Sequence, residues 1–381
     1  MIYLDHNSTT PCDPRVVDAM RKYWGSEFGN ADSPHRMGRR ANQAISQARG
    51  SVAEALCCNP SEIIFTSGAT ESNNLLFLSA LAAEPTERRK VVISSIEHKS
   101  VGEPARLLSQ HGFDVCNVIT TTDGVVDLQH AEDLIDDHTL LVSVQMVNNV
   151  LGTVQPIEEI GRICQQHGAF FHSDAAQAFG KLPVDARSLG CDVASISAHK
   201  AYGPKGVGAL YVRGGPARWR WPKAVLGGGQ ERGIRPGTRN VPGIVGMGVA
   251  AELIGEAFRR GEVARLRKLE ENFVAQLTGS ISGVTVICQS SARTPGVLAI
   301  GFGGVDASLL VDCLSETAVS RGSACSGATA GVSHVLSAIR CPDALARSTI
   351  RVSMGRATSA SDITAATEDI RAAVARIRET E

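Results

Sequence analysis

Short apolar runs alternate with longer stretches of helical spacing along the first two thirds of this chain. The runs that predict strands are 63–66, 91–94, 140–147, 169–173, 193–197 and 208–212. Apolar residues at helical spacing predict helices at 13–24, 36–56, 67–81, 101–111 and 157–167. Strands that alternate with helices of this length are typical of βαβ units in a mainly parallel sheet.

The last third alternates more sparsely. It predicts strands at 296–302 and 349–353 and a helix at 307–314, a pattern typical of a small α+β domain. A charged helical stretch at 249–277 separates the two patterns. We predict a large domain of residues 14–250 and a smaller α+β domain made of residues 1–13 and 251–381.

Polar residues follow several predicted strands at their carboxyl ends, where ligands gather in parallel sheets. Lys200 is the most informative of them, because it ends a strand-like run and is followed at once by a glycine-rich turn. Asp174 ends the preceding run. A strand-end lysine can form a Schiff base, and an aspartate can keep a pyridine nitrogen protonated. The pair favours a site for pyridoxal 5′-phosphate (PLP).

Other strand-end residues fit such a site, but each also has a plainer interpretation. The turn around Ala69 and Thr70 could hold a phosphate at a helix N-terminus, or could be a simple capping box. His98 could stack on a ring and move protons, or be an ordinary hydrogen-bonded histidine. Asn149 and Gln177 could reach a ring oxygen, or stand in turns.

Arg351 lies in a predicted strand of the small domain. Its planar set of donors suits a substrate carboxylate, although a surface salt bridge would use it equally well.

Cys325 lies in a segment of small residues, 319–332, that lacks bulky apolar neighbours. Such a segment predicts an exposed loop in which a thiolate could form and attack. An incidental loop thiol is the alternative, and we favour a nucleophile because an exposed unpaired thiol is a liability.

Composition excludes several classes of protein. A net charge of −1 gives no overall field for nucleic acid or anionic membranes, although residues 213–223 are locally basic. The ten cysteines form no C-x-x-C pair, so no zinc or dithiol site is indicated and we predict no metal. No secretory signal precedes the first strand and no uninterrupted apolar run approaches ~20 residues. We expect a cytoplasmic protein.

As a set, the motifs resemble those of cysteine desulfurases of the NifS/IscS type, which are class V, fold type I PLP enzymes. The resemblance runs from Ile2 to about Arg356. The segments that carry it are Phe28-Gly-Asn30, Phe65-Thr-Ser-Gly-Ala-Thr-Glu-Ser72, Glu97-His-Lys99, Val147-Asn-Asn149, Asp174-Ala-Ala-Gln177, Ser197-Ala-His-Lys200, Tyr202-Gly-Pro-Lys-Gly206, Gly233-Ile-Arg-Pro-Gly-Thr238 and Gly322-Ser-Ala-Cys325.

The resemblance implies a fold type I large domain with a mainly parallel seven-stranded sheet, and a conversion of L-cysteine to L-alanine that leaves a persulfide on Cys325. It implies a homodimer, because Thr238 would reach the phosphate of the other subunit. Lys200 would bind PLP covalently, Asp174 would meet the pyridine nitrogen, and His98 would stack on the ring. The remaining roles are Asn149 and Gln177 near the ring oxygen, Ala69, Thr70, Ser197 and His199 at the phosphate, and Asn30 and Arg351 at the substrate carboxylate.

Three positions depart from the family pattern. Asp32 puts a negative charge near the expected substrate entrance, Val150 replaces a glutamate, and Arg321 stands beside the nucleophile loop where a serine is common. A guanidinium at position 321 could favour the Cys325 thiolate.

Two other functions stay open at this point. One is a selenocysteine lyase or another class V lyase, for which Cys325 could be dispensable. The other is a non-catalytic sulfur-transfer scaffold. The sulfur acceptor could be an iron–sulfur scaffold, a tRNA-thiolation relay or a DNA phosphorothioation protein. The sequence ends at Glu381 without an extended tail, which favours a specialised partner.

Overall fold

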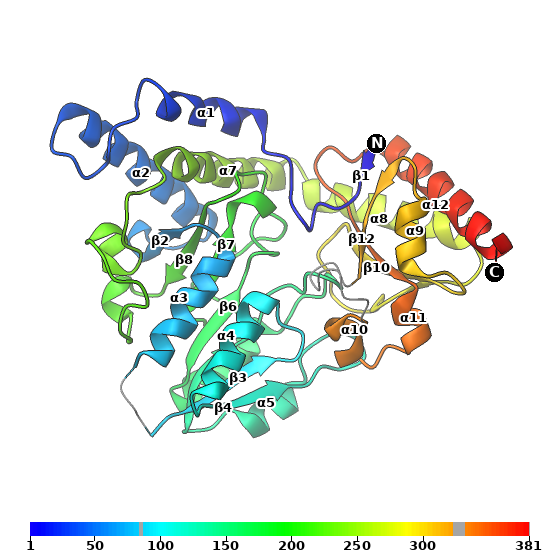
Figure 1. The fold of residues 1–381 in the computed structure, drawn as a ribbon, viewed down its shortest axis with the longest axis horizontal. Helices are drawn as coiled ribbons and strands as arrows, with labels where there is room; N and C mark the ends of the chain where they lie inside the picture. Colours follow the sequence, from blue (N-terminus) through cyan, green and yellow to red (C-terminus); the bar gives the residue numbers. More distant parts are fainter. Residues whose placement is uncertain (84–86, 323–331, 381) are drawn as a thin grey trace.

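The computed structural model describes residues 1–83, 87–322 and 332–380. Two sheets, each with its own helices, stand side by side in Figure 1. The N-terminal segment begins on the smaller half at β1 (Ile2–Tyr3) and crosses to the larger half before α1 (Pro14–Trp24). The predicted two-part α/β architecture is therefore confirmed.

The larger half is built on a seven-stranded sheet in the order β2-β8-β7-β6-β5-β3-β4. Neighbouring strands from β4 to β7 are parallel, and β8 pairs antiparallel with both β7 and β2. Most of these strands are apolar and buried, as expected for a sheet covered on both faces. The strands are β2 (Ile63–Thr66), β3 (Lys90–Ser94), β4 (Asp114–Val118), β5 (Thr139–Ser143), β6 (Phe170–Asp174), β7 (Val193–Ser197) and β8 (Gly208–Val212).

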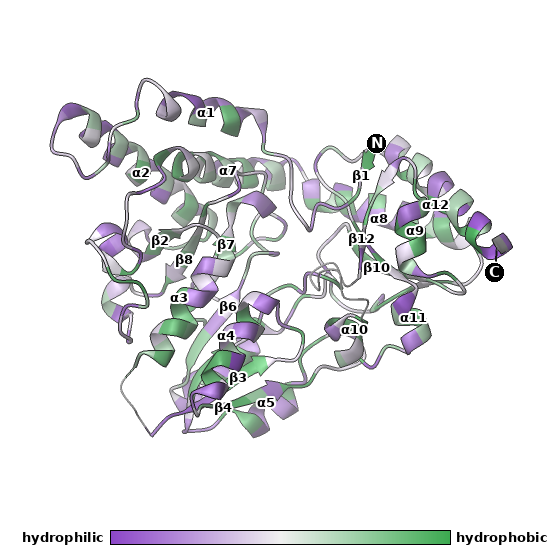
Figure 2. Ribbon diagram, in the orientation of Figure 1, coloured by the Kyte–Doolittle hydropathy of each residue, from purple (hydrophilic) through white to green (hydrophobic). Residues whose placement is uncertain are grey.

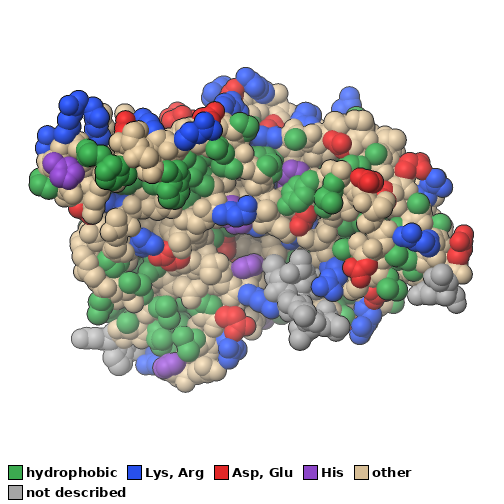
Figure 3. All heavy atoms as spheres, turned by 45° about the horizontal axis from the view of Figure 1, so that its top comes forward, with side chains coloured by type: hydrophobic (Ala, Val, Ile, Leu, Met, Phe, Trp, Pro, Cys, Tyr) green, Lys and Arg blue, Asp and Glu red, His purple; other side chains and the backbone are tan. Residues whose placement is uncertain are grey.

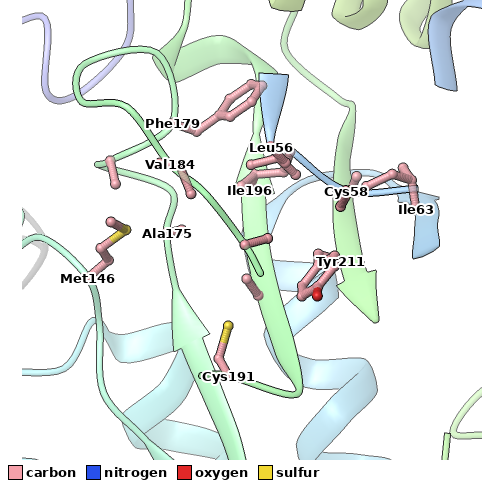
Figure 4. Packing of buried hydrophobic residues seen from close by; sticks show 14 of the residues in the cluster. Leu56, Cys58, Ile63, Met146, Ala175, Phe179, Val184, Cys191, Ile196 and Tyr211 are labelled. Carbon is pink, nitrogen blue, oxygen red and sulfur yellow. The ribbon is translucent and has the colours of Figure 1, made fainter. Parts of the chain in front are cut away.

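Helices cover this sheet and turn their polar faces outward (Figure 2). The remaining helices of this half are α2 (Arg36–Ala55), α3 (Ala69–Leu81), α4 (Lys99–Gln110), α5 (Leu128–Leu134), α6 (Ile157–His167) and α7 (Val241–Arg259). The core lies between them and the strands; Figure 4 shows Phe179, Ile196 and Tyr211 within one cluster of buried apolar side chains. This packing fixes the positions of the carboxyl ends of the strands in the large sheet.

The smaller half has a four-stranded sheet in the order β12-β13-β10-β9, with all neighbours antiparallel. Its own core includes Phe273, Phe302 and Ile350. A short parallel pair, β1 with β11 (Thr317–Ala318), joins the N-terminus to this half. The other elements are α8 (Glu262–Ser280), β9 (Val284–Val286), β10 (Val297–Phe302), α9 (Ala307–Cys313), β12 (Ser320–Arg321), α10 (His334–Ala338), α11 (Asp343–Arg347), β13 (Thr349–Ser353) and α12 (Ala360–Thr380).

The stretch predicted at 249–277 is helical except for one break that the sequence did not reveal. The chain forms two helices there, α7 and α8, which are separated at Gly261, a residue in the left-handed region at φ 77°. α7 packs against α2 and α1, whereas α8 packs against α12. The division at residue 250 stays a prediction, and we now favour a boundary near Gly261.

α7 also bears on the prediction about membranes. Among the described helices it is the one with the length and composition to span a bilayer, although Glu252 and Glu256 interrupt its apolar run. However, 61% of its apolar window is buried within the protein. A buried core helix explains this composition.

A buried ion pair fastens the loop at 227–238 to the large sheet. Both oxygens of the Glu231 carboxylate accept from Arg49, at 2.6 and 2.8 Å, and the same carboxylate accepts from the backbone N–H of Phe65 in β2 at 2.9 Å. The Glu231 side chain is 1% exposed. Breaking such a pair leaves a buried charge without compensation.

We expect Glu231→Gln to lower the free energy of unfolding by about 3 kcal/mol, because it leaves the Arg49 charge unpaired. Denaturant titration followed by circular dichroism would measure the change. The matched control is Asp18→Asn, which removes an exposed pair with Arg21 and should cost less than about 1 kcal/mol. Equal losses in the two variants would contradict this account of Glu231.

Candidate active site

A cavity of about 580 Å³ lies where the carboxyl ends of the large sheet meet the N-terminal segment and β13. Figure 3 shows a hollow between the two halves, with histidine, cationic and acidic side chains along its walls. Its walls combine the β2–α3 turn, the residues after β3, β6 and β7, and Arg351 of the smaller half.

Ten of the thirteen predicted site residues line this one cavity. They are Ala69, Thr70, His98, Asn149, Asp174, Gln177, Ser197, His199, Lys200 and Arg351. Asn30 and Thr238 are exposed and do not line it. Cys325 lies outside the described residues.

Asp174 is buried at the end of β6 and accepts two hydrogen bonds. Asn73 Nδ2 donates to its Oδ2 at 2.8 Å, and the backbone N–H of Ala176 donates to its Oδ1 at 2.9 Å. Asn73 Nδ2 also donates to Ser100 Oγ at 2.9 Å. These two donors hold the carboxyl group in place at the cavity wall, where it could accept from a pyridinium N–H.

His98 begins α4 and faces the same cavity. Its Nδ1 accepts from the backbone N–H of Ser100 at 3.1 Å and lies 2.8 Å from Ser100 Oγ. Because Nδ1 accepts, Nε2 carries the proton in the neutral ring. A chain of hydrogen bonds thus runs from His98 to Ser100, from Ser100 to Asn73, and from Asn73 to Asp174.

The N-terminus of α3 lines one end of the cavity. Its N-cap, Gly68, offers no side chain, so the backbone N–H groups of the first turn have no side-chain cap. Glu71 also lines the cavity, and its carboxylate accepts from the Ser67 N–H and from Arg235 Nε. The reciprocal capping box considered above is therefore not formed.

His199 stands near this end. Burial, followed by the charges of Lys200, Lys205 and Lys181, lowers its pKa to about 4. The ring is therefore neutral at physiological pH, and its Nδ1 lies 3.1 Å from Thr9 Oγ1. A neutral histidine can present one N–H to an anion without adding a charge.

Lys200 completes a 3₁₀ turn directly after β7. Its Nζ donates to the backbone carbonyls of Asn7 and Ser8, the second at 2.8 Å. Lys200 therefore extends from the end of a strand of the large sheet, and its amine binds to the N-terminal segment.

Arg351 reaches the cavity from β13. Its NH1 donates to the Asn149 carbonyl at 3.0 Å, and its NH2 donates to Asp5 Oδ1 and Ser8 Oγ, both at 2.7 Å. The guanidinium is 3% exposed, so its direction is fixed. Arg351 therefore forms an ion pair with Asp5, but this pair is largely buried rather than at the surface.

Sequence reasoning missed Asn7, Ser8, Asn73 and Ser100. Asn7 and Ser8 lie in a polar stretch without periodicity, and their partners are far away in the chain. Asn73 lies one turn inside α3 and Ser100 is the second residue of α4, and their only signal was their spacing from Thr70 and His98.

The cavity fits PLP. An uncapped helix N-terminus suits the phosphate, a buried carboxylate with two donors suits the pyridinium, and a lysine at the end of a strand suits the aldehyde. The described residues contain no cluster of His, Cys, Asp and Glu that could hold a metal ion.

The three departures have local explanations. Asp32 does not line the cavity; it pairs with Arg239 and accepts from Gln230 Nε2 at 3.0 Å. Val150 is buried in an apolar cluster with Ile96. Arg321 is exposed, and its NH1 donates to Ser308 Oγ at 3.3 Å.

A family model described as aminotransferase class-V matches residues 2–365. The chain belongs to this family. It is 41% identical to the cysteine desulfurase IscS of Rickettsia africae, over 99% of this chain and 92% of that protein. A solved NifS-like protein superposes with a TM-score of 0.90 at 36% identity, covering 98% of this chain and 99% of the other.

A structure described as SspA in complex with cysteine matches with a TM-score of 0.81 at 36% identity, covering 93% of this chain and 99% of the other. Enzymes of this family depend on PLP, as the fit of the cavity indicates.

Glu97 is a buried carboxyl immediately before His98. Burial raises its pKa to about 8, an effect that hydrogen bonds from Ser94 and Gln145 oppose and the charge of Asp174 reinforces. Its Oε1 accepts from Ser94 Oγ at 2.5 Å and from the Gln145 N–H at 2.8 Å, whereas its Oε2 has no partner among the described residues. Glu97 is therefore neutral in the folded protein at pH 7.

We expect Glu97→Gln to flatten the pH dependence of stability. In the wild type the carboxyl ionises near pH 4.5 when unfolded but near pH 8 when folded, so the free energy of unfolding falls as pH rises through that window. The amide stays neutral and removes at least about 1 kcal/mol of this fall, measured by denaturant titration at pH 5 and pH 8. Glu103→Gln, an exposed position on α4, is the control. An unchanged slope in Glu97→Gln would show that Glu97 is ionised when folded.

Proposed function

We propose that this protein is a PLP-dependent L-cysteine desulfurase, which converts L-cysteine to L-alanine and leaves a persulfide on Cys325 for an acceptor protein. The observation that carries the proposal is the convergence of Lys200, Asp174 and Arg351 on one cavity. The first two residues suit PLP, and the third suits the carboxylate of an amino acid. The IscS and NifS-like relatives support this choice.

Each residue has a defined task in this proposal. Lys200 holds PLP covalently, and Asp174 keeps its ring nitrogen protonated, while Asn149 and Gln177 lie by the ring oxygen. Bound PLP withdraws electrons from the α-carbon of the substrate. His98, with its proton on Nε2, lies where it can stack on the ring and move protons.

The carboxylate of the substrate binds Arg351, whose donors are already aimed by Asn149 and Ser8. The Cys325 thiolate then attacks the substrate sulfur. A new S–S bond forms as the Cβ–S bond breaks, and the electron pair left on Cβ takes up a proton to give alanine. Asn30 and Thr238 lie outside the cavity of one chain, so we assign them to a site completed by a second copy.

We expect Cys325→Ala to lower persulfide formation from L-cysteine by at least about 100-fold while PLP stays bound, because the variant loses only the nucleophile. Alanine release and protein persulfide would be measured together, with the yellow absorbance as the check on PLP. Cys313→Ala, which removes another free thiol of the smaller half, is the control.

Persulfide formation that persists in Cys325→Ala would refute the assignment of the nucleophile. Selenide release from selenocysteine by the same variant, with cysteine turnover lost, would instead indicate a lyase. A colourless wild-type protein that does not take up PLP would indicate a non-catalytic scaffold.

We further propose a cytoplasmic homodimer. The cysteines of the described residues are free thiols, which suits a reducing compartment. Trp24 and Phe28 are 70% and 71% exposed at one end of the larger half, so a second copy would bury apolar surface there. Sedimentation equilibrium should give a particle of two chains, and a single-chain particle would contradict the dimer.

An iron–sulfur scaffold, a tRNA-thiolation relay and a DNA phosphorothioation protein all take sulfur from a persulfide. Incubation with radiolabelled cysteine and each purified acceptor in turn would identify the class, since only the true acceptor should take up label in a Cys325-dependent way.

A further inference from the structure

Lys181 is a second lysine that the backbone places next to Lys200. It follows Gly180, which has φ 84° and lies so close to Ala201 that an added Cβ would come within 2.6 Å of the Ala201 side chain. Only glycine permits this approach. The contact brings residue 181 against the turn that carries Lys200, although Lys181 itself does not line the cavity.

The Lys181 ammonium is held by two side-chain oxygens that belong to residues of the cavity wall. Its Nζ donates to Asn7 Oδ1 and to Gln177 Oε1, the second at 2.5 Å. Gln177 Nε2 in turn donates to the Asn7 carbonyl at 3.0 Å. Lys181, Gln177 and Asn7 thus form a closed triangle of hydrogen bonds.

Asn7 is the point where this triangle meets Lys200. Its carbonyl accepts from both Gln177 Nε2 and Lys200 Nζ. The other polar atoms of Asn7 are also bound: its N–H donates to Ser353 Oγ at 2.8 Å, and its Nδ2 donates to the Asn149 carbonyl at 3.2 Å. Asn7 is 1% exposed, so it cannot turn without breaking several buried hydrogen bonds.

We propose that Lys181 is a positioning residue for Lys200. Lys181 acts by donating hydrogen bonds to Asn7 and Gln177 and by placing a second positive charge beside the Lys200 amine. The proposal deepens the proposed function, because it rests on Lys200 as the lysine that binds PLP. No other role so far accounts for a lysine at this buried position.

The Lys181 and Lys200 amines lie close enough for the charge of one to affect the other. Burial, and then the charges of Lys200 and Arg351, lowers the pKa of Lys181 well below its usual value, whereas Asp5 raises it. The charge of Lys181 in turn contributes to the lowered pKa values of His6 and His199. Asp5 is the carboxylate that faces this group of cations, and it is already paired with Arg351. The effect is mutual, so that loss of the Lys200 charge on binding PLP favours a charge on Lys181, and a charge on Lys181 disfavours a proton on the nitrogen of Lys200.

The test is a pH titration of the visible absorbance of the holoenzyme, which follows protonation of the nitrogen that joins Lys200 to PLP. We expect Lys181→Met to move the midpoint upward by about one pH unit, since a nearby positive charge is lost. Lys181→Arg keeps the charge and should restore the midpoint to within about 0.3 pH units of the wild type. Lys268→Met, an exposed position on α8, should leave it unchanged.

A second variant tests the link through Asn7. Asn7→Ala keeps the backbone carbonyl that accepts from Lys200 but removes the side-chain amide oxygen that accepts from Lys181. It should move the midpoint in the same direction, and the double variant with Lys181→Met should move it no further than Lys181→Met alone. If Lys181→Met does not fold, Asn7→Ala alone tests the inference, and an unchanged midpoint in that variant would overturn it.

An unchanged midpoint in a folded, yellow Lys181→Met protein would overturn the inference and leave the proposed function intact. If the proposed function is wrong about the lysine that binds PLP, the Lys200→Ala variant would still form the covalent yellow complex with PLP. A midpoint that Lys181→Arg fails to restore, with Lys268→Met normal, would also overturn the inference.

Discussion

The site depends on one constraint, which is that the N-terminal segment must bind both halves of the protein at once. Asp5 pairs with Arg351 on β13, and Asn7 donates to Ser353 on the same strand. In the larger half, the Thr10 hydroxyl accepts from the backbone N–H of Tyr202 and donates to the carbonyl of His199, the residue before Lys200. This buried segment, together with direct contacts such as the hydrogen bond from Arg351 to the Asn149 carbonyl, fixes the distance between the lysine of one half and the arginine of the other.

Burial gives these polar contacts their weight. Lys181, Lys200 and Arg351 bring three cationic groups together with Asp5, so the cavity is electropositive and suits a ligand with phosphate and carboxylate groups. Burial keeps Glu97 neutral, and burial together with the charges of neighbouring lysines keeps His199 neutral.

The sequence predicted much of this arrangement, and its failures have physical reasons. Strand ends such as Asp174 and Lys200 were found because buried parallel strands have a strong apolar pattern and break abruptly into polar residues. β4 was missed because it lies at the edge of its sheet, where exposed Asp114 and Asn117 interrupt the pattern. Asn7 could not be found, since nothing local in a polar stretch reveals partners on β13. The break within the helical stretch at 249–277 was not predicted, because helical spacing resumes directly after Gly261.

The contact between Asn7 and Ser353 also sets an order of events during synthesis. The two residues are 346 positions apart, so the segment made first must wait for a strand made almost last. The large sheet can form while the ribosome is still extending the chain, with its strand ends already in place. The carbonyls of Asn7 and Ser8 that bind the Lys200 amine are fixed only after β13 has been synthesised. A nascent chain therefore contains Lys200 long before the position of its amine is fixed.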